Sequence, residues 1–292
     1  MGTFLQLFRK FISYHENAFD YFDKRKGVTI QAYHNRYNLV QQFLHERDLL
    51  QIAPIEFTIA VGRAFFNWLL QQEYSHNYCV RVVGMCRAAL HYGAAHELIQ
   101  YNPLAAYRIP KLPPAKPVYL TLDEIQRLEV YDPANSMDEK ARDMFLFQCY
   151  TGLDYGDLIS VRRSNIIDYR GKLYISKDRN KSNIEANIPY TEMADFLFKK
   201  HDYNMRLLSN PKYNKALKDV AIDAGIDKHL TTHVGRKTYA MTMLNHNQYS
   251  IEAVSKMLGH KSVKTTETYY AQVNIQLIHK ELTEKETRLK RA

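Results

Sequence analysis

A histidine and an arginine stand close together in the last third of the 292-residue chain. From Thr231 to Arg236 the chain reads Thr-Thr-His-Val-Gly-Arg. If a threonine caps a helix here, His233 and Arg236 project from one face of it, because residues three apart are neighbours on a helix. A proton-transfer group beside a fixed cation suits chemistry at a phosphate group. Taken alone, such a pair is more often a solvated helix face, so the neighbouring segments decide the interpretation.

A second histidine follows a short predicted helix. From Ser250 to Gly259 the chain has a serine cap, apolar residues at helical spacing and a glycine stop. His260 therefore emerges directly after a helix end, where its imidazole can point into a cleft. Nine residues later comes Tyr269. A tyrosine hydroxyl can attack phosphorus when cations lower the cost of the developing charge, and a covalent intermediate then forms.

The first part of the chain supplies a different kind of element. Up to about residue 108, apolar residues recur at helical spacing, which predicts a bundle of four or five helices. Four of the nine prolines fall between Ile109 and Val118, where they prevent a continuous helix. We therefore expect a helical domain over residues 1–108, a linker over 109–118 and a second domain over 119–292. Its last stretch, Ile275 to Ala292, has the composition of a basic helical tail.

The second domain combines helices with a small β-structure. Thr121 and Glu124 have the spacing of a capping box, so a helix should begin at Leu122. Later, apolar and polar residues alternate on both sides of the polar turn at 179–183, which predicts a β-hairpin. The expected fold class is mainly α with a small sheet or hairpin.

Composition limits the classes of partner. Forty Lys and Arg residues against 31 Asp and Glu give a formal charge of +9, which suits a nucleic acid, although a merely basic protein would look the same. Three cysteines without a C-x-x-C pair, and no H-E-x-x-H motif, argue against a zinc site, a disulfide framework and a metal-dependent nuclease. Because no run approaches about 18 apolar residues, we expect no membrane span and a cytoplasmic location.

Taken together, these segments resemble the tyrosine recombinase or phage integrase family. The order Thr-Gly-Leu, basic hairpin, His-x-x-Arg, Leu-Gly-His and Tyr covers nearly all of residues 119–275. The resemblance implies a SAM-like helical core-type DNA-binding domain followed by an α+β catalytic domain. It also implies site-specific cleavage and rejoining of duplex DNA through a 3′-phosphotyrosyl intermediate, for integration, excision or inversion of a mobile element. Such an enzyme uses neither a metal nor another cofactor.

The resemblance assigns roles to the residues of these motifs. Arg236 would grip the nonbridging oxygens of the scissile phosphate, His233 would assist proton transfer, and His260 would hydrogen-bond the same phosphate. Tyr269 would be the nucleophile, since nine residues after the histidine is the commoner spacing in the family. Tyr270 is the alternative nucleophile, because some members place the tyrosine one residue later.

The hairpin turn contributes a further group through the same resemblance. Lys181 matches the family's mobile hairpin lysine, whose ammonium can protonate the departing 5′ oxygen. Arg179, two residues earlier, is a possible supporting cation. On its own, a hairpin lysine is nearly always a solvated charge.

One position departs from the family pattern. Asp154 stands directly after Thr-Gly-Leu, where the family usually has an arginine. A carboxylate there repels a phosphate, and the missing guanidinium would have contributed several kcal/mol to the transition state. Either activity is lost or another cation substitutes; Arg142, Arg162 and Arg163 are near enough in sequence to be candidates. Asp157 matches an acidic position that packs behind the site, although an ordinary helix carboxylate is an equal alternative.

Some integrases of Bacteroides-type mobile elements resemble this sequence and also lack that arginine. The main alternative function is a catalytically impaired recombinase-like DNA-binding protein, and a type IB topoisomerase shares the tyrosine chemistry. The expected partners are double-stranded recombination sites, further copies of the chain forming dimers and tetramers on DNA, and host or element-encoded DNA-bending factors. Many members of the family have an additional small arm-site-binding domain before the core-binding domain, so this chain is either a simple two-domain member or a truncated one. The protein would act at the bacterial nucleoid.

Overall fold

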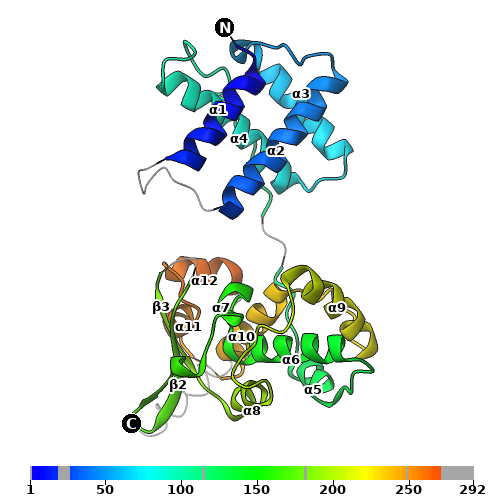
Figure 1. Ribbon diagram of the computed structural model, residues 1–292, viewed down its shortest axis with the longest axis vertical. Helices are drawn as coiled ribbons and strands as arrows, with labels where there is room; N and C mark the ends of the chain where they lie inside the picture. Colours follow the sequence, from blue (N-terminus) through cyan, green and yellow to red (C-terminus); the bar gives the residue numbers. More distant parts are fainter. Residues whose placement is uncertain (1, 19–26, 114–115, 181–182, 248, 271–292) are drawn as a thin grey trace, which may run out of the picture. The chain divides into compact units, whose positions relative to one another are not determined.

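The structure of the protein is a computed structural model, which describes residues 2–18, 27–113, 116–180, 183–247 and 249–270. The chain divides into two compact units, Met1–Pro113 and Pro114–Ala292, which are drawn in Figure 1. Among the described residues, no helix is long and apolar enough to cross a membrane.

The first unit is a bundle of helices around an aromatic core. Within its described residues it has four α-helices and one 3-10 turn: α1 (Phe4–Asn17), α2 (Gly27–Glu46), η1 (Pro54–Glu56), α3 (Ile59–Gln71) and α4 (His76–Ala95). Helix α1 packs against α2 and α4, and α3 packs against α4. Phe8, Phe43 and Phe65 are fully buried between them. This helix count agrees with the four or five predicted.

The stretch after residue 108 is held against the first unit by side chains of α4. Asn77 and Leu112 exchange two hydrogen bonds, of 3.0 Å from Asn77 Nδ2 to the Leu112 carbonyl and 2.9 Å from the Leu112 amide to Asn77 Oδ1. A ring nitrogen of His76 lies 2.8 Å from the Pro110 carbonyl. The described residues of 109–118 form neither helix nor strand, in keeping with the fixed φ of their prolines.

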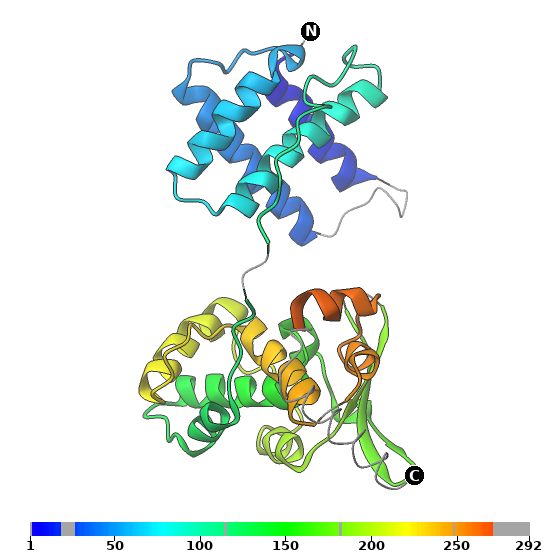
Figure 2. The ribbon, with the colours of Figure 1, turned by 180° about the vertical axis from the view of Figure 1, so that it is seen from behind.

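The second unit places a three-stranded sheet beside a group of helices. Its described elements are α5 (Leu122–Val130), α6 (Ser136–Thr151), α7 (Tyr155–Leu158), η2 (Arg163–Asn165), β1 (Ile166–Tyr169), β2 (Lys172–Asp178), β3 (Glu185–Pro189), α8 (Glu192–Lys200), α9 (Asn210–Asp223), α10 (Thr232–Asn245), α11 (Ile251–Met257) and α12 (Val263–Tyr270). The strands are antiparallel in the order β1-β2-β3. Helix α6 packs against α8, α9 and α10, while α11 lies between β3 and α12 (Figure 2).

Several local predictions are confirmed in this unit. Helix α5 begins at Leu122 with the capping box, in which Thr121 accepts from the Glu124 amide and Glu124 accepts from the Thr121 amide. Strands β2 and β3 form the predicted hairpin, with Ile175 opposite Ile188. The mainly helical fold class with a small sheet is also confirmed. Strand β1 was not predicted, because its four residues are mostly exposed and do not alternate in polarity.

A glycine ends the central helix α6. Gly152 has φ +64°, and its amide donates to the Gln148 carbonyl at 2.8 Å. A β-carbon there would lie 2.4 Å from Cδ1 of Tyr239, which is fully buried. Both the left-handed backbone and the lack of space therefore require glycine at this position.

We predict that Gly152→Ala destabilises the second unit by about 2–4 kcal/mol, because it adds left-handed strain and an overpacked contact with Tyr239. Gly171→Ala is the matched control, since Gly171 has φ +77° with no atom within 4 Å of an added β-carbon, and strain alone costs about 1 kcal/mol. Urea unfolding of the three proteins measures both. Equal losses of stability would contradict the contact with Tyr239.

Candidate active site

Arg236 is held between the ends of two helices. Its Nη1 donates to the Gly152 carbonyl at 2.6 Å, and its Nη2 donates to the Leu258 carbonyl at 2.7 Å. Gly152 and Leu258 are the residues that cap the C-terminal ends of α6 and α11. Carbonyls at such ends carry partial negative charge and lack partners within their own helix. They therefore fix a guanidinium in one place at little electrostatic cost.

His260 follows α11 through a turn that leaves it little freedom. Gly259 has φ +62°, its amide donates to the Lys256 carbonyl at 2.9 Å, and the His260 amide donates to the Ser255 carbonyl at 3.0 Å. This pair of bonds is a Schellman motif. The predicted glycine stop thus sets the direction in which the His260 side chain leaves the helix.

The His260 ring joins Arg236 to helix α12. Nε2 lies 3.1 Å from Arg236 Nη2, and Nδ1 lies 2.9 Å from the hydroxyl of Thr266, which is fully buried. Because a guanidinium can only donate, Nε2 is the acceptor and Nδ1 carries the proton. Burial, then the charges of Arg236 and Arg179, lower the pKa of His260 to about 4. The ring is therefore neutral at neutral pH.

Arg179 brings a second guanidinium into the same region. It follows β2 directly, and its side chain is 3% exposed. Its Nε lies 3.0 Å from Asp157 Oδ2, and its Nη2 lies 3.6 Å from Asp154 Oδ2. Its Nη1 is buried without a hydrogen-bond partner among the described residues. The aliphatic part of the side chain packs against Gly259, where a β-carbon would lie 2.5 Å from its Cγ.

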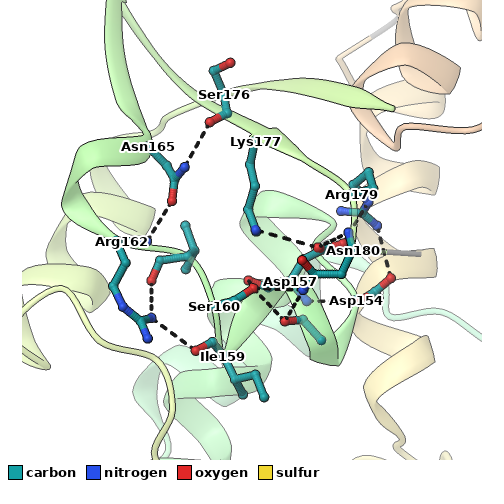
Figure 3. A network of polar contacts seen from close by, with 12 residues as sticks. Asp154, Asp157, Ile159, Ser160, Arg162, Asn165, Ser176, Lys177, Arg179 and Asn180 are labelled. Atoms are coloured by element: carbon teal, nitrogen blue, oxygen red, sulfur yellow. Dashed lines mark hydrogen bonds and ion pairs between the residues drawn. The ribbon is translucent and has the colours of Figure 1, made fainter. Parts of the chain in front are cut away.

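The end of strand β2 is fixed to α7 by further polar contacts (Figure 3). The Asn180 amide donates to Asp157 Oδ1 at 2.9 Å, and its Nδ2 donates to the Gly156 carbonyl at 2.9 Å and to Ser160 Oγ at 3.0 Å. Lys177 Nζ lies 4.0 Å from Asp157 Oδ1. The pKa of Asp157 is raised overall, because the effect of burial exceeds that of the Asn180 amide and the charge of Arg179, which lower it.

Residues 118–276 match the phage integrase family, which is more than half of the chain. This chain belongs to the phage integrase family.

Individual relatives agree with this membership. The tyrosine recombinase XerD of Listeria monocytogenes is 24% identical over 263 residues, covering 82% of this chain and 86% of the relative. Among solved structures, the integrase of transposon Tn1549 in complex with a circular intermediate DNA has a TM-score of 0.73 at 16% identity, covering 97% of this chain and all of that one. A lambda integrase tetramer bound to a Holliday junction has a TM-score of 0.71 at 16% identity, covering 92% of this chain and 80% of the lambda integrase chain.

The other residues to which the family resemblance assigns roles lie in α10, in α12 and outside the described residues. His233 is the second residue of α10 and is exposed. Tyr269 and Tyr270 are the last two residues of α12, and their side chains are outside the described part. Lys181 also lies outside the described residues and follows Asn180 directly in sequence. Helix α10 begins at Thr232 after Thr231, whose side chain makes no capping bond.

The three arginines that sequence proximity offered as replacements are engaged elsewhere. Arg142 pairs with Asp143 at 2.8 Å. Arg162 donates to the carbonyls of Ile159 and Val161, on the side of α7 away from Asp154 in Figure 3. Arg163 lies over the ring of Tyr203, with its Cζ 5.0 Å from the ring centroid.

Sequence reasoning missed several groups that build this site. Thr266 gives no signal, because it is one of three threonines in a short helical segment. The carbonyls of Gly152 and Leu258 are backbone groups, which no motif names. Asn180 lies inside the predicted polar turn and reads there as an ordinary turn residue. Among the described residues, no cluster of three or more His, Cys, Asp or Glu side chains could hold a metal ion.

We predict that the imidazole of His260 titrates with a pKa of about 4 in the DNA-free protein. Arg179→Gln should raise this pKa toward the ordinary value of 6.5, because one of the two neighbouring cations is removed. Imidazole resonances followed by NMR against pH give both values. The control is Arg162→Gln, which should leave the titration unchanged. An unaltered pKa in the Arg179 variant would mean that this guanidinium lies farther from His260.

Proposed function

We propose that this chain is a tyrosine-type site-specific recombinase that cleaves and rejoins duplex DNA through a 3′-phosphotyrosyl intermediate. One observation carries the proposal. Arg236 and the neutral His260 are held 3.1 Å apart, and His260 is bonded to Thr266 in the helix that also contains Tyr269. A fixed cation, an imidazole and a tyrosine on one packed unit are the groups that phosphoryl transfer to a hydroxyl requires.

The chemistry follows from these groups. The hydroxyl oxygen of Tyr269 attacks the scissile phosphorus, and its proton passes to His233. The bond between phosphorus and the 5′ oxygen breaks, and that oxygen takes a proton from Lys181. Arg236 stabilises the charge on the nonbridging oxygens. Because the phosphotyrosyl bond keeps the energy of the broken phosphodiester, rejoining by the reverse steps needs no ATP.

His260 changes its hydrogen bonding when a phosphate is bound. In the DNA-free protein its Nε2 accepts from Arg236. A nonbridging oxygen placed against Arg236 would take this donor, and Nε2 would then contact the phosphate in the tautomer that carries a proton there. Thr266 Oγ1 can serve either tautomer, because a hydroxyl both donates and accepts.

Arg179 supplies the charge that Asp154 cannot. Its guanidinium is 3% exposed, and Nη1 has no hydrogen-bond partner among the described residues. It is close enough to His260 to lower the pKa of that imidazole. We therefore assign to Nη1 of Arg179 the phosphate contact that the family takes from the arginine after Thr-Gly-Leu. This assignment favours an active enzyme over the impaired DNA-binding alternative.

The finer setting of the reaction rests on the family resemblance and the named relatives. We propose that residues 1–108 form the core-type DNA-binding domain, that 109–118 link it to the catalytic domain 119–292, and that copies of the chain assemble as dimers and tetramers on recombination sites. The absent arginine groups the chain with integrases of Bacteroides-type mobile elements. We propose that the protein acts at the nucleoid, with DNA-bending factors as further partners.

A nicked suicide substrate carrying the recombination site tests the function. We expect the wild type to form a covalent protein–DNA adduct in the presence of EDTA, visible on a denaturing gel. Tyr269→Phe should abolish the adduct, whereas Tyr270→Phe should retain it. Loss only in Tyr270→Phe would move the nucleophile by one residue. DNA binding without any adduct in the wild type would support the impaired DNA-binding protein.

The role of Arg179 has its own test on the same substrate. We expect Arg179→Gln to slow single-turnover cleavage by about 10²–10³-fold, as loss of one transition-state donor does. The dissociation constant for DNA should change by less than about tenfold, since many phosphate contacts share the affinity. Arg170→Gln, in the exposed β1–β2 turn, is the control for loss of a positive charge. Equal cleavage rates in the two variants would remove Arg179 from the phosphate site.

A further inference from the structure

We infer that Asp154 is a positioning residue: its carboxylate, standing where the family has an arginine, orients the Arg179 guanidinium, and the two residues function as one exchanged pair. The inference rests on the proposed function. On this inference Asp154 contributes to the site and does not impair it.

Two carboxylates form ion pairs along one edge of the Arg179 guanidinium. Asp157 Oδ2 lies 3.0 Å from Nε, and Asp154 Oδ2 lies 3.6 Å from Nη2 (Figure 3). Nε and Nη2 form one edge of the planar group. These contacts are ion pairs: Asp157 Oδ2 has no hydrogen-bond partner among the described residues. The attraction of two carboxylates along one edge favours one orientation of the guanidinium plane, and with it one direction of the remaining nitrogen, Nη1. That nitrogen is the one left buried without a hydrogen-bond partner among the described residues.

The carboxylate of Asp154 is itself held in place. Asp154 is the N-cap of α7, and its Oδ1 accepts from the Asp157 amide at 3.1 Å. The other oxygen, Oδ2, is therefore the one that faces Arg179. The Asp154 side chain is 29% exposed, whereas that of Asp157 is fully buried. Asp157 anchors the inner end of the guanidinium edge, and Asp154 sets its angle from the outside.

The two positions are coupled by charge. A buried guanidinium needs anionic partners to offset its desolvation. Arg179 reaches them by crossing from the end of β2 to α7. With arginine at 154, two guanidinium groups would meet at Asp157, and one of them would lack a carboxylate. We therefore expect a cation at only one of the two positions, 154 or 179. With an acid at 154, the cation is favoured at 179.

Helix capping alone is the competing explanation for Asp154. Asparagine separates the two, because it is an equally good N-cap but carries no charge. We expect Asp154→Asn to slow single-turnover cleavage by about tenfold or more, since misdirected catalytic groups have effects of this size. The DNA dissociation constant and the melting temperature should stay close to those of the wild type. The control is Asp168→Asn, because Asp168 also accepts from a backbone amide, that of Gly171 at 3.0 Å, in an exposed turn.

The reciprocal exchange gives the decisive readout. Arg179→Gln alone should be nearly inactive. The double variant D154R/R179Q places arginine after Thr-Gly-Leu, as in the family, and leaves Asp157 as its partner. We expect it to cleave at least about tenfold faster than Arg179→Gln, as directly coupled residues do in a double-mutant cycle. A role in folding alone would produce no such recovery.

Each outcome decides the inference. A slow Asp154→Asn together with recovery in the double variant supports it. A wild type that forms the adduct while Asp154→Asn forms it equally fast overturns the positioning role and leaves the proposed function intact. Absence of recovery in a double variant that melts like the wild type overturns the exchange of the pair. A wild type that forms no adduct overturns the proposed function, and the inference with it.

Discussion

The catalytic unit depends on one guanidinium that two helix ends hold. Arg236 bonds the carbonyls that close α6 and α11, and it contacts His260 with the same nitrogen that reaches Leu258. Helices end where their carbonyls lose partners, so a cation placed there satisfies both ends at once. The glycines that terminate these helices are therefore part of the site, because they decide where the carbonyls point.

A second group of charges is organised around a buried acid. Asp157 accepts a hydrogen bond from the Asn180 amide and forms an ion pair with Arg179, so its carboxylate joins the hairpin to the short helix α7. In a protein interior a charge without a partner is costly, and this cost keeps the strand end and the helix together. A tyrosine-type recombinase that lacks the usual arginine thus keeps two guanidinium groups near its histidine.

The sequence predicts features whose cause is local and misses those whose cause is distant. The capping box at Thr121 and the stop at Gly259 are read correctly, because caps depend on a few consecutive residues. The pairing of Asp154 with Arg179 joins positions on different elements, and proximity along the chain favours other arginines. Strand β1 has no alternating pattern to reveal it, since the sheet edge is mostly exposed.

The bond between Thr266 and His260 links the proposed phosphate site to the helix that contains Tyr269. If α12 moved along its axis by one turn, about 5.4 Å, Thr266 would leave Nδ1 and the imidazole would lose the partner that fixes its orientation. The position of the helix that contains the proposed nucleophile would therefore affect the orientation of the imidazole that we propose to contact the phosphate. In such an enzyme the imidazole of His260 would be correctly oriented only when the helix that contains Tyr269 is correctly placed, so cleavage would depend on the position of that helix.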